Sequence, residues 1–345
     1  MRDRPPGALD VRRDLWRIVQ TVVVLTKNQR QREDPVYAEL LSRVRVGECK
    51  ALPVEKNRPS DVDILYKRVA HRVFQQQPEA LRGFADAPVI VGTKSLRDTI
   101  NARRAYHHAA SMGQELHLYH SKDRMNRAPV PARLRKPLWG IGSSKTQDAL
   151  GQLPLFPGMC VMVLENLAFS RGLVNGAEGT VEEVLWEEHD GYRYATAAYV
   201  RVPGSGQVCA DRETDIVPIF PVTSHFKVQM IVNGKLRTKG ISRQQLPILP
   251  AYAYTDYKSQ GKSLQKAIID IESANSLQGV YVMLSHVRSL QGLLVLRPFM
   301  QSKLCRRLSQ ELRQELERIN KLSETTKDQY KKSIAVQNNL DMDYS

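Results

Sequence analysis

The sequence predicts an α/β protein in which a small antiparallel β-barrel interrupts a parallel-sheet domain and a C-terminal amphipathic helix follows. Three observations predict this class. A strand leads directly into a helix before residue 110, short strands with turn residues between them fill residues 153–245, and strand–helix–strand texture returns after residue 250. Alternating strands and helices are typical of parallel sheets, whereas short strands joined by Asn-Gly and Asp-Gly turns are typical of small barrels or sandwiches.

The N-terminal third is predicted to hold a short strand, a helix and a strand–helix unit. The apolar run Val22–Leu25 has the length of a short buried strand. Apolar residues at helical spacing predict a helix from Asp34 that stops at Gly47. The strand Pro88–Gly92 then leads into a helix with Ser95 as its cap.

The middle of the chain changes texture at Leu153. A basic connector with Pro and Ser, 121–152, precedes this point, and apolar or alternating runs follow at 159–164, 179–185, 192–202, 216–220 and 226–232. We therefore predict one α/β domain formed by 1–152 together with 246–300, and an inserted barrel at 153–245.

The C-terminal part is predicted to complete the α/β domain and then to form one amphipathic helix. Ala267–Ile271 and Leu293–Leu296 have the pattern of strands, and Gly279–Leu284 that of a helix. A leucine stripe predicts a helix at 301–322, which we expect to pack on its own domain since a strict heptad is absent. Residues 323–345 are polar and are expected to form a flexible tail.

Composition narrows the classes of partner. The chain has 345 residues, and its 51 Lys and Arg against 36 Asp and Glu give a net charge of +15. This surplus favours a polyanionic partner, with nucleic acid first, nucleotide phosphates next and a membrane surface last, although a merely soluble basic protein is the alternative. No run reaches the roughly 18 apolar residues of a membrane span, and no apolar segment of a secretory signal follows the N-terminus.

Metal-binding patterns are weak in this sequence. The four cysteines are scattered and form no CxxC pair, which favours a reducing compartment and excludes a zinc cluster. His107, His108, His117 and His120 have no cysteine or acidic partner at ligand spacing. We expect them on the surface and expect no metal site.

Two segments imitate a phosphate-binding P-loop. Gly261-Lys262-Ser263 has Asp256 where the first glycine of a Walker A loop must stand, and Gly140–Thr146 has Ser144 in place of the glycine before lysine. The glycines of that loop let successive backbone N–H groups wrap the phosphates, so we reject both segments.

Several blocks, in order along the chain, carry a family resemblance. They are Leu25-Thr26-Lys27-Asn28-Gln29-Arg30-Gln31, the blocks Pro157–Asn166 and Gly172–Val181, Thr255-Asp256-Tyr257-Lys258-Ser259-Gln260-Gly261-Lys262-Ser263, and Tyr281-Val282-Met283-Leu284-Ser285-His286-Val287-Arg288-Ser289. Together they resemble the second half of a superfamily 1B DNA helicase of the Pif type, and are most similar to the fungal versions carried by Helitron-like elements. The resemblance covers about residues 14–320.

The resemblance implies a second RecA-like domain with an inserted, Src-homology-like barrel, from a 5′→3′ DNA helicase that hydrolyses ATP. In such helicases two RecA-like domains clamp ATP, and the P-loop and the Mg²⁺-binding acid belong to the first. Because this sequence shows neither, we expect it to bind ATP and Mg²⁺ only with a separate P-loop domain, and not to be an autonomous ATPase.

The resemblance also places residues at the nucleotide. Arg30 is expected to be an arginine finger, and a plain surface arginine is the alternative. The second finger position holds His286, whose imidazole lacks the permanent charge and the planar fork of arginine. Gln260, Gly261 and Ser263 are expected near the nucleotide.

A single-stranded DNA face is implied by two segments. Thr255, Tyr257, Lys258 and Ser259 are expected to face the DNA strand, with a solvated turn as the alternative. A second contact with the DNA backbone is expected from Thr93 and Asn101, although Thr93 is equally suited to be a helix cap.

Three functional hypotheses remain open at this stage. The chain is one half of an ATP-dependent DNA helicase, or a degenerate transposon-derived protein that still binds single-stranded DNA, or an interaction module whose barrel contacts a protein partner. The resemblance also implies the family's roles in DNA repair, recombination and telomere maintenance. It further implies an intracellular, nuclear location.

Overall fold

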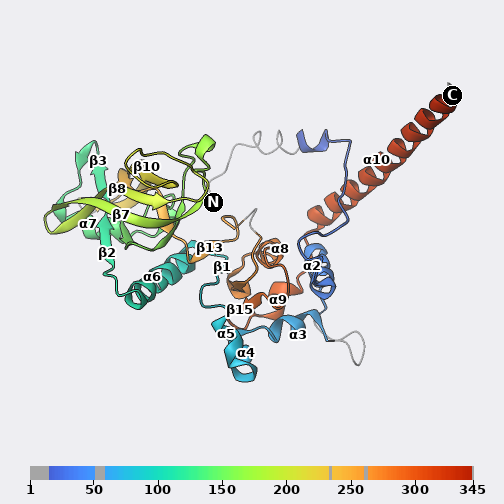
Figure 1. Ribbon diagram of the computed structural model, residues 1–345, viewed down its shortest axis with the longest axis horizontal. Coiled ribbons are helices and arrows are strands. Elements are labelled where there is room, and N and C mark those ends of the chain that lie inside the picture. The colour runs from blue at the N-terminus through green and yellow to red at the C-terminus, as the bar shows by residue number, and fades with distance from the viewer. Residues whose placement is uncertain (1–14, 51–58, 233–234, 260–262, 344–345) are drawn as a thin grey trace.

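The computed structural model describes residues 15–50, 59–232, 235–259 and 263–343. Figure 1 shows two lobes connected by helix α6 (Lys94–Ser111), one built around a parallel sheet and the other rich in β-strands. Helix α10 (Gln310–Asp343) extends away from both lobes. The predicted α/β class with a β-rich insertion is therefore confirmed.

The parallel sheet has the strand order β13-β1-β14-β15, formed by Ala253–Thr255, Val89–Val91, Ala267–Ile269 and Leu293–Val295. Every residue of these strands is buried, as is typical of a parallel sheet with covers on both faces. The central strand β1 pairs with β13 on one side and with β14 on the other. The strands predicted at 88–92, 267–271 and 293–296 are thus confirmed as β1, β14 and β15, each shorter than predicted.

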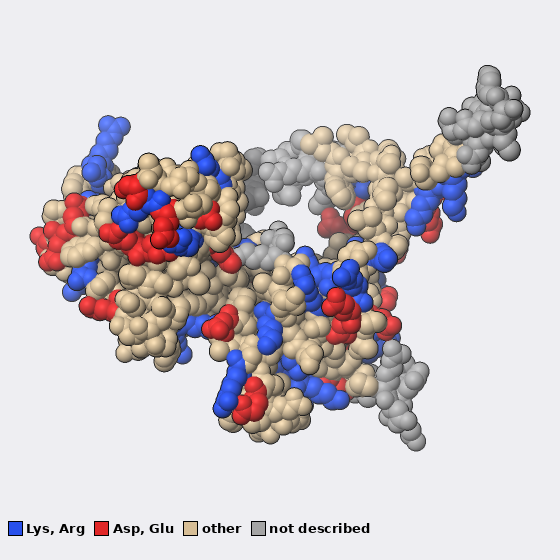
Figure 2. All heavy atoms as spheres, viewed as in Figure 1, with Lys and Arg blue, Asp and Glu red and all other residues tan. Residues whose placement is uncertain are grey.

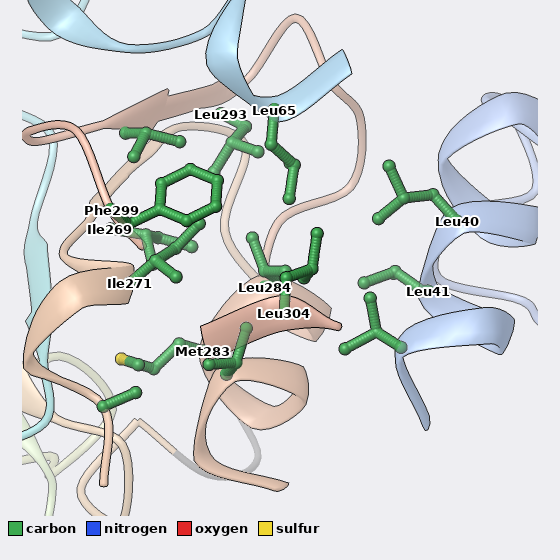
Figure 3. Packing of buried hydrophobic residues seen from close by; sticks show 14 of the residues in the cluster. Leu40, Leu41, Leu65, Ile269, Ile271, Met283, Leu284, Leu293, Phe299 and Leu304 are labelled. Atoms are coloured by element: carbon green, nitrogen blue, oxygen red, sulfur yellow. The ribbon is translucent and has the colours of Figure 1, made fainter. Parts of the chain in front are cut away.

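Helices cover the parallel sheet and form its main core. They are α2 (Pro35–Val46), α3 (Asp61–Tyr66), α4 (Ala70–Gln76), α5 (Pro78–Arg82), α8 (Leu277–Ser285) and α9 (Gln301–Leu304), with the 3-10 turn η3 (Ile271–Ser273). Figure 3 shows Leu40 and Leu41 of α2 directed toward Leu284 and Leu304. Burial of such side chains contributes roughly 1.5–3 kcal/mol each.

The predicted helix between Asp34 and Gly47 is confirmed as α2, but the strand predicted before it is wrong. Asp34 caps the helix by accepting from the Tyr37 N–H, and Gly47 ends it in a left-handed conformation with φ 76°. Residues 22–25 form no strand, and Leu25 is 86% exposed. The Val22 N–H donates instead to the Thr326 hydroxyl of α10, so this apolar run lies along a helix and not inside a sheet.

The β-rich lobe contains two sheets. The larger one is barrel-like and has the order β12-β6-β7-β8-β2-β5, with β9 also paired to β8; its strands are Ile248–Pro250, Cys160–Val163, Glu178–His189, Tyr192–Arg201, His117–His120, Gln152–Leu155 and Ile216–Ile219. The smaller sheet has the order β10-β11-β3-β4, with strands Val222–Val232, Lys235–Gln245, Lys122–Met125 and Ala128–Pro129. Helix α7 (Ala132–Trp139) and the 3-10 turns η1 (Ser143–Lys145) and η2 (Phe169–Arg171) complete the lobe.

Strand pairing places the start of this lobe earlier than the predicted residue 153. Strand β2 pairs with β5 and β8, and β3 pairs with β11, so the basic connector 121–152 is part of the β-rich lobe. Sequence pattern missed these strands because they are short and polar. Their pairing is fixed by distant partners and not by their own periodicity.

A fully buried ion pair holds the smaller sheet to its surroundings. The Arg243 guanidinium of β11 donates to both carboxylate oxygens of Asp123, at 2.8 and 2.7 Å, and also to the Ala149 and Leu138 carbonyls. Arg243 is 0% exposed. A buried charge is tolerated only when it is paired and its remaining donors are satisfied, and here both conditions are met.

The C-terminal helix differs from its predicted form. The segment 301–322 is divided into α9 and α10, and α10 continues through 323–343, where a flexible tail was predicted. Leu312 and Leu316 pack against the main core, as expected for a helix that covers its own domain. Contacts from the N-terminal segment, including Trp16 with Glu315, lie along the same helix.

Asn101 connects α6 to the edge of the parallel sheet. Its side-chain amide accepts from the Ala253 N–H at 2.7 Å and donates to the Ala253 carbonyl at 3.3 Å. Asn101 is 3% exposed, so these bonds satisfy a buried backbone unit at the start of β13.

We predict that Asn101→Ala lowers the free energy of unfolding by about 1–3 kcal/mol, since it leaves a buried N–H and a buried carbonyl without partners. Urea denaturation followed by circular dichroism measures this loss. Arg103→Ala, an exposed position on the same helix, is the control and should change stability by less than about 0.5 kcal/mol. Equal effects of the two substitutions would contradict the role of Asn101.

Candidate functional site

The carboxyl ends of the parallel strands lie at one edge of the sheet, where loops carry the polar residues. Gly92 and Thr93 follow β1, and Asp256–Ser259 follow β13. A side chain at Gly92 would meet the Ser273 carbonyl oxygen at 2.2 Å, so only glycine allows this approach. In open α/β sheets, ligands bind outside this edge.

Arg30 lies at one end of the segment that follows β13. Its Nε donates to the Ser263 hydroxyl at 3.0 Å, and its Nη1 donates to the Ser285 carbonyl at 2.8 Å. A hollow at this point is lined by Gln29, Arg30, Arg32, Glu33, Ser263 and Arg288. The structure thus brings together Arg30 and Ser263, two residues that are far apart in the sequence.

Gln31 fixes the position of Arg30. The buried Gln31 side chain donates to the Ser285 carbonyl at 3.1 Å and to the Val287 carbonyl at 2.6 Å. The hydroxyl of Tyr37 donates to the Leu284 carbonyl at 2.7 Å. These bonds pair backbone carbonyls at and just after the C-terminus of α8. The last carbonyls of a helix have no hydrogen-bond partner within the helix, so side chains from elsewhere can bind them.

His286 lies below the surface and does not line the hollow. It caps the C-terminus of α8 and is 3% exposed. Burial raises the pKa of Asp256, and the charge of a protonated His286 acts in the opposite direction, which places the two side chains near each other. The expected finger position is therefore occupied by a core residue.

A second hollow lies at the other end of the same segment. It is lined by Tyr257 and Lys258 together with a loop of the β-rich lobe, Gly172, Val174, Asn175, Gly176 and Ala177. The Lys258 ammonium donates to the Asn175 side-chain oxygen, and Tyr257 is 79% exposed. Burial lowers the pKa of Lys258.

The other predicted DNA contacts of this segment lie inside the fold. Thr255 is a buried residue of β13, and the Ser259 hydroxyl donates to the Asp256 carbonyl at 2.8 Å while its side chain is buried. These two residues shape the turn from within. Tyr257 and Lys258 form its exposed surface, while Gln260 and Gly261 lie outside the described residues.

Thr93 and Asn101 do not form a common surface. The Thr93 hydroxyl caps α6 by accepting from the Leu96 N–H, which confirms the helix-cap alternative; Ser95, predicted as the cap, lies inside the helix. Asn101 is buried against β13, where its amide bonds the Ala253 backbone, and its contact with the DNA backbone stays a prediction. An amide side chain suits both roles equally, and only tertiary packing distinguishes them.

An ionic cluster beside Thr93 was not found from the sequence. The Lys94 ammonium donates to Asp148 at 2.8 Å, and the buried Arg97 guanidinium donates to Asp148, Ser143 and Asp98. Burial works to raise the pKa of Asp148, but the hydrogen bond from Lys94 and the charge of Arg97 hold that pKa below its usual value. Ser143 belongs to the rejected Gly140–Thr146 pattern and serves this cluster.

The histidines and the long helices offer no other obvious site. The His108 ring is hydrogen-bonded to the Tyr252 hydroxyl, and the His120 ring packs against Trp139, so neither is the free surface histidine expected. No group of three or more His, Cys, Asp or Glu side chains is placed to hold a metal ion within the described residues.

None of the helices in the described ranges combines the length and apolar character needed to cross a membrane.

The fold and the site define a RecA-like α/β domain with a barrel-like insertion, in which Ser263 lines a basic hollow and Lys258 contacts the inserted lobe. Among solved structures, the Pif1 helicase of Bacteroides in complex with ADP-AlF3 and single-stranded DNA matches this fold with a TM-score of 0.58 at 19% identity, covering 92% of this chain and 64% of that one. The Pif1 helicase of Candida albicans matches with a TM-score of 0.52 at 20% identity, over 85% of this chain and 60% of that one.

Curated relatives match by sequence over a shorter part. The chain is 37% identical over 157 residues to the ATP-dependent DNA helicase PIF1 of Rattus norvegicus, and 37% identical over 144 residues to that of Mus musculus. These matches show homology to Pif1-type helicases over about two fifths of this chain. They span only 21% and 19% of the lengths of those relatives. No protein-family model matches the sequence.

We predict that Asp148→Asn destabilises the fold at neutral pH by about 1.5–3 kcal/mol, since the buried Arg97 loses one of its two carboxylate partners and keeps only Asp98. The folded-state pKa of Asp148 is depressed, so its contribution is present above the unfolded pKa of about 3.9 and is lost as pH falls through the folded value. Urea denaturation of both proteins across this range should show the difference shrinking in acid. A difference independent of pH would contradict this assignment.

Proposed function

We propose that this chain is the second motor domain of an ATP-dependent 5′→3′ DNA helicase, which binds single-stranded DNA and completes the ATP site of a separate P-loop domain. One observation carries the proposal: the segment after β13 lines both hollows, with Tyr257 and Lys258 at one and Ser263 at the other.

The hollow at Tyr257 and Lys258 has the chemistry of a single-strand site. An exposed tyrosine ring can stack on any base, and a lysine beside an amide side chain suits a phosphate. The net charge of +15 adds long-range attraction for a polyanion. In Figure 2, Lys and Arg side chains gather over the α/β lobe, and acidic side chains cover part of the β-rich lobe.

The hollow at Arg30 fits the phosphate end of ATP. Guanidinium groups and the Ser263 hydroxyl are donors that suit phosphate oxygens. Its one carboxylate, Glu33, is 3.6 Å from Arg32, so the hollow itself has no free carboxylate for Mg²⁺. ATP would supply the phosphoryl group, and this chain's residues would hold and neutralise its terminal oxygens opposite a P-loop domain.

The similarities support this proposal. The curated relatives are named ATP-dependent DNA helicases, and solved relatives hold single-stranded DNA or a nucleotide analogue. For the whole protein, the proposal extends further. It includes a P-loop domain as the partner, a nuclear location, a Helitron origin, and roles in DNA repair, recombination and telomere maintenance.

The second candidate is a degenerate transposon-derived protein that binds single-stranded DNA, or a protein partner through its barrel, without catalysis. The burial of His286 at the expected finger position favours it, because loss of an arginine finger lowers phosphoryl-transfer rates by about 10³ or more.

Binding of a labelled single-stranded oligonucleotide, measured by fluorescence anisotropy at two salt concentrations, tests the DNA site. We expect Tyr257→Ala to weaken binding by about 1–3 kcal/mol through lost stacking. Lys258→Ala should weaken binding and reduce the salt slope by about one. Lys67→Ala, at an exposed lysine directly after α3, is the matched control for charge. If Lys67→Ala and Lys258→Ala weaken binding equally, the DNA site is misplaced.

We further predict that the purified chain hydrolyses ATP no faster than background, since its sequence offers no P-loop to hold the nucleotide. A coupled phosphate-release assay with and without single-stranded DNA measures this. ATP turnover that disappears in Arg30→Ala would overturn the prediction, because it would show that this chain alone builds a complete site.

A further inference from the structure

Three arginines converge on the hollow beside Ser263, and they differ in their partners. Arg32 is paired with Glu33. The Arg30 guanidinium donates hydrogen bonds to the Ser263 hydroxyl and the Ser285 carbonyl. In the part of the chain that the structure describes, the Arg288 guanidinium has no ion pair or hydrogen bond, although the residue lines the hollow.

The backbone fixes Arg288 at this place. Leu264 donates its N–H to the His286 carbonyl at 2.8 Å, and Arg288 donates its N–H to the Leu264 carbonyl at 3.2 Å. This short parallel bridge follows the end of α8 and holds residue 288 next to Ser263. His286 is turned into the core by the same geometry, while Arg288 is exposed.

The hollow therefore has a net positive charge, because Arg30, Arg32 and Arg288 line it with Glu33 as the one carboxylate. Like charges at close range repel, and an anion with several oxygens relieves that repulsion while it accepts hydrogen bonds from Arg30 and Arg288. A terminal phosphate suits this arrangement better than a carboxylate does, because it presents more oxygens to two planar donors.

We propose that Arg288 binds the terminal phosphate of a nucleoside triphosphate together with Arg30, a role that the buried His286 is not placed to take. The identity of the triphosphate rests on the proposed function, whereas the phosphate site rests on the hollow itself. Arg288 belongs to the binding residues of this hollow, and His286 is a buried support of the adjoining turn.

Inorganic triphosphate is the probe, because it carries the phosphate chain without a base or sugar. Titration of the full chain at constant ionic strength, followed by ³¹P NMR, gives its dissociation constant. We expect Arg288→Ala and Arg30→Ala each to weaken binding about tenfold. Arg288→Lys should fall between, because lysine keeps the charge and lacks the fork. Arg103→Ala, an exposed arginine on α6, removes the same charge elsewhere and should have less than a twofold effect.

Triphosphate binding that is the same in Arg288→Ala as in the unmodified chain would overturn the proposal, and so would equal losses in Arg288→Ala and Arg103→Ala. Single-strand binding of the same variants separates this result from the proposed function, since Arg288→Ala should leave it unchanged. If the chain binds no single-stranded DNA but its triphosphate binding depends on Arg288, the phosphate site stands and the helicase role fails. If DNA binding depends on Lys258 but triphosphate binding is unchanged in Arg288→Ala, the helicase role stands and the proposed phosphate site fails.

Discussion

The pairing of β1 with β13 is the constraint on which the candidate site depends. These strands lie on opposite sides of the β-rich insertion in sequence, and their parallel register, Val89 with Ala253 and Val91 with Thr255, brings the two halves of the α/β domain together. Asn101 strengthens the same junction by bonding both backbone groups of Ala253. Without this pairing, the segment after β13 would have no fixed place relative to α6 or the insertion.

The same junction sets the relation between the lobes. Helix α6 leaves β1 and carries Lys94 and Arg97 to Asp148, which belongs to the β-rich lobe by strand pairing of its neighbours. Lys258 meets Asn175 a short distance away. These polar contacts lie beside apolar ones, since Ala105 and Ala109 of α6 pack into the core of the β-rich lobe.

At the hollow lined by Arg30, buried and exposed residues have different roles. Buried groups such as Gln31 and His286 determine where the backbone of α8 ends, and half-buried or exposed arginines line the hollow that results. A guanidinium at a surface keeps its charge at little cost, whereas a buried one needs a carboxylate, as Arg243 has in Asp123. Exposed arginines without such partners are therefore the ones suited to an anion from outside.

The sequence by itself determined the α/β class, the inserted β-rich region, α2 with its cap, and the blocks around Arg30, Lys258 and Ser263. Those features depend on local periodicity, turn residues and short motifs. Only the tertiary structure decided that Val22–Leu25 lies along α10, that Asn101 and Thr255 are buried, and that Arg288 lines the hollow while His286 is buried. Such placements depend on which distant segment packs against each residue, and no local pattern carries that information.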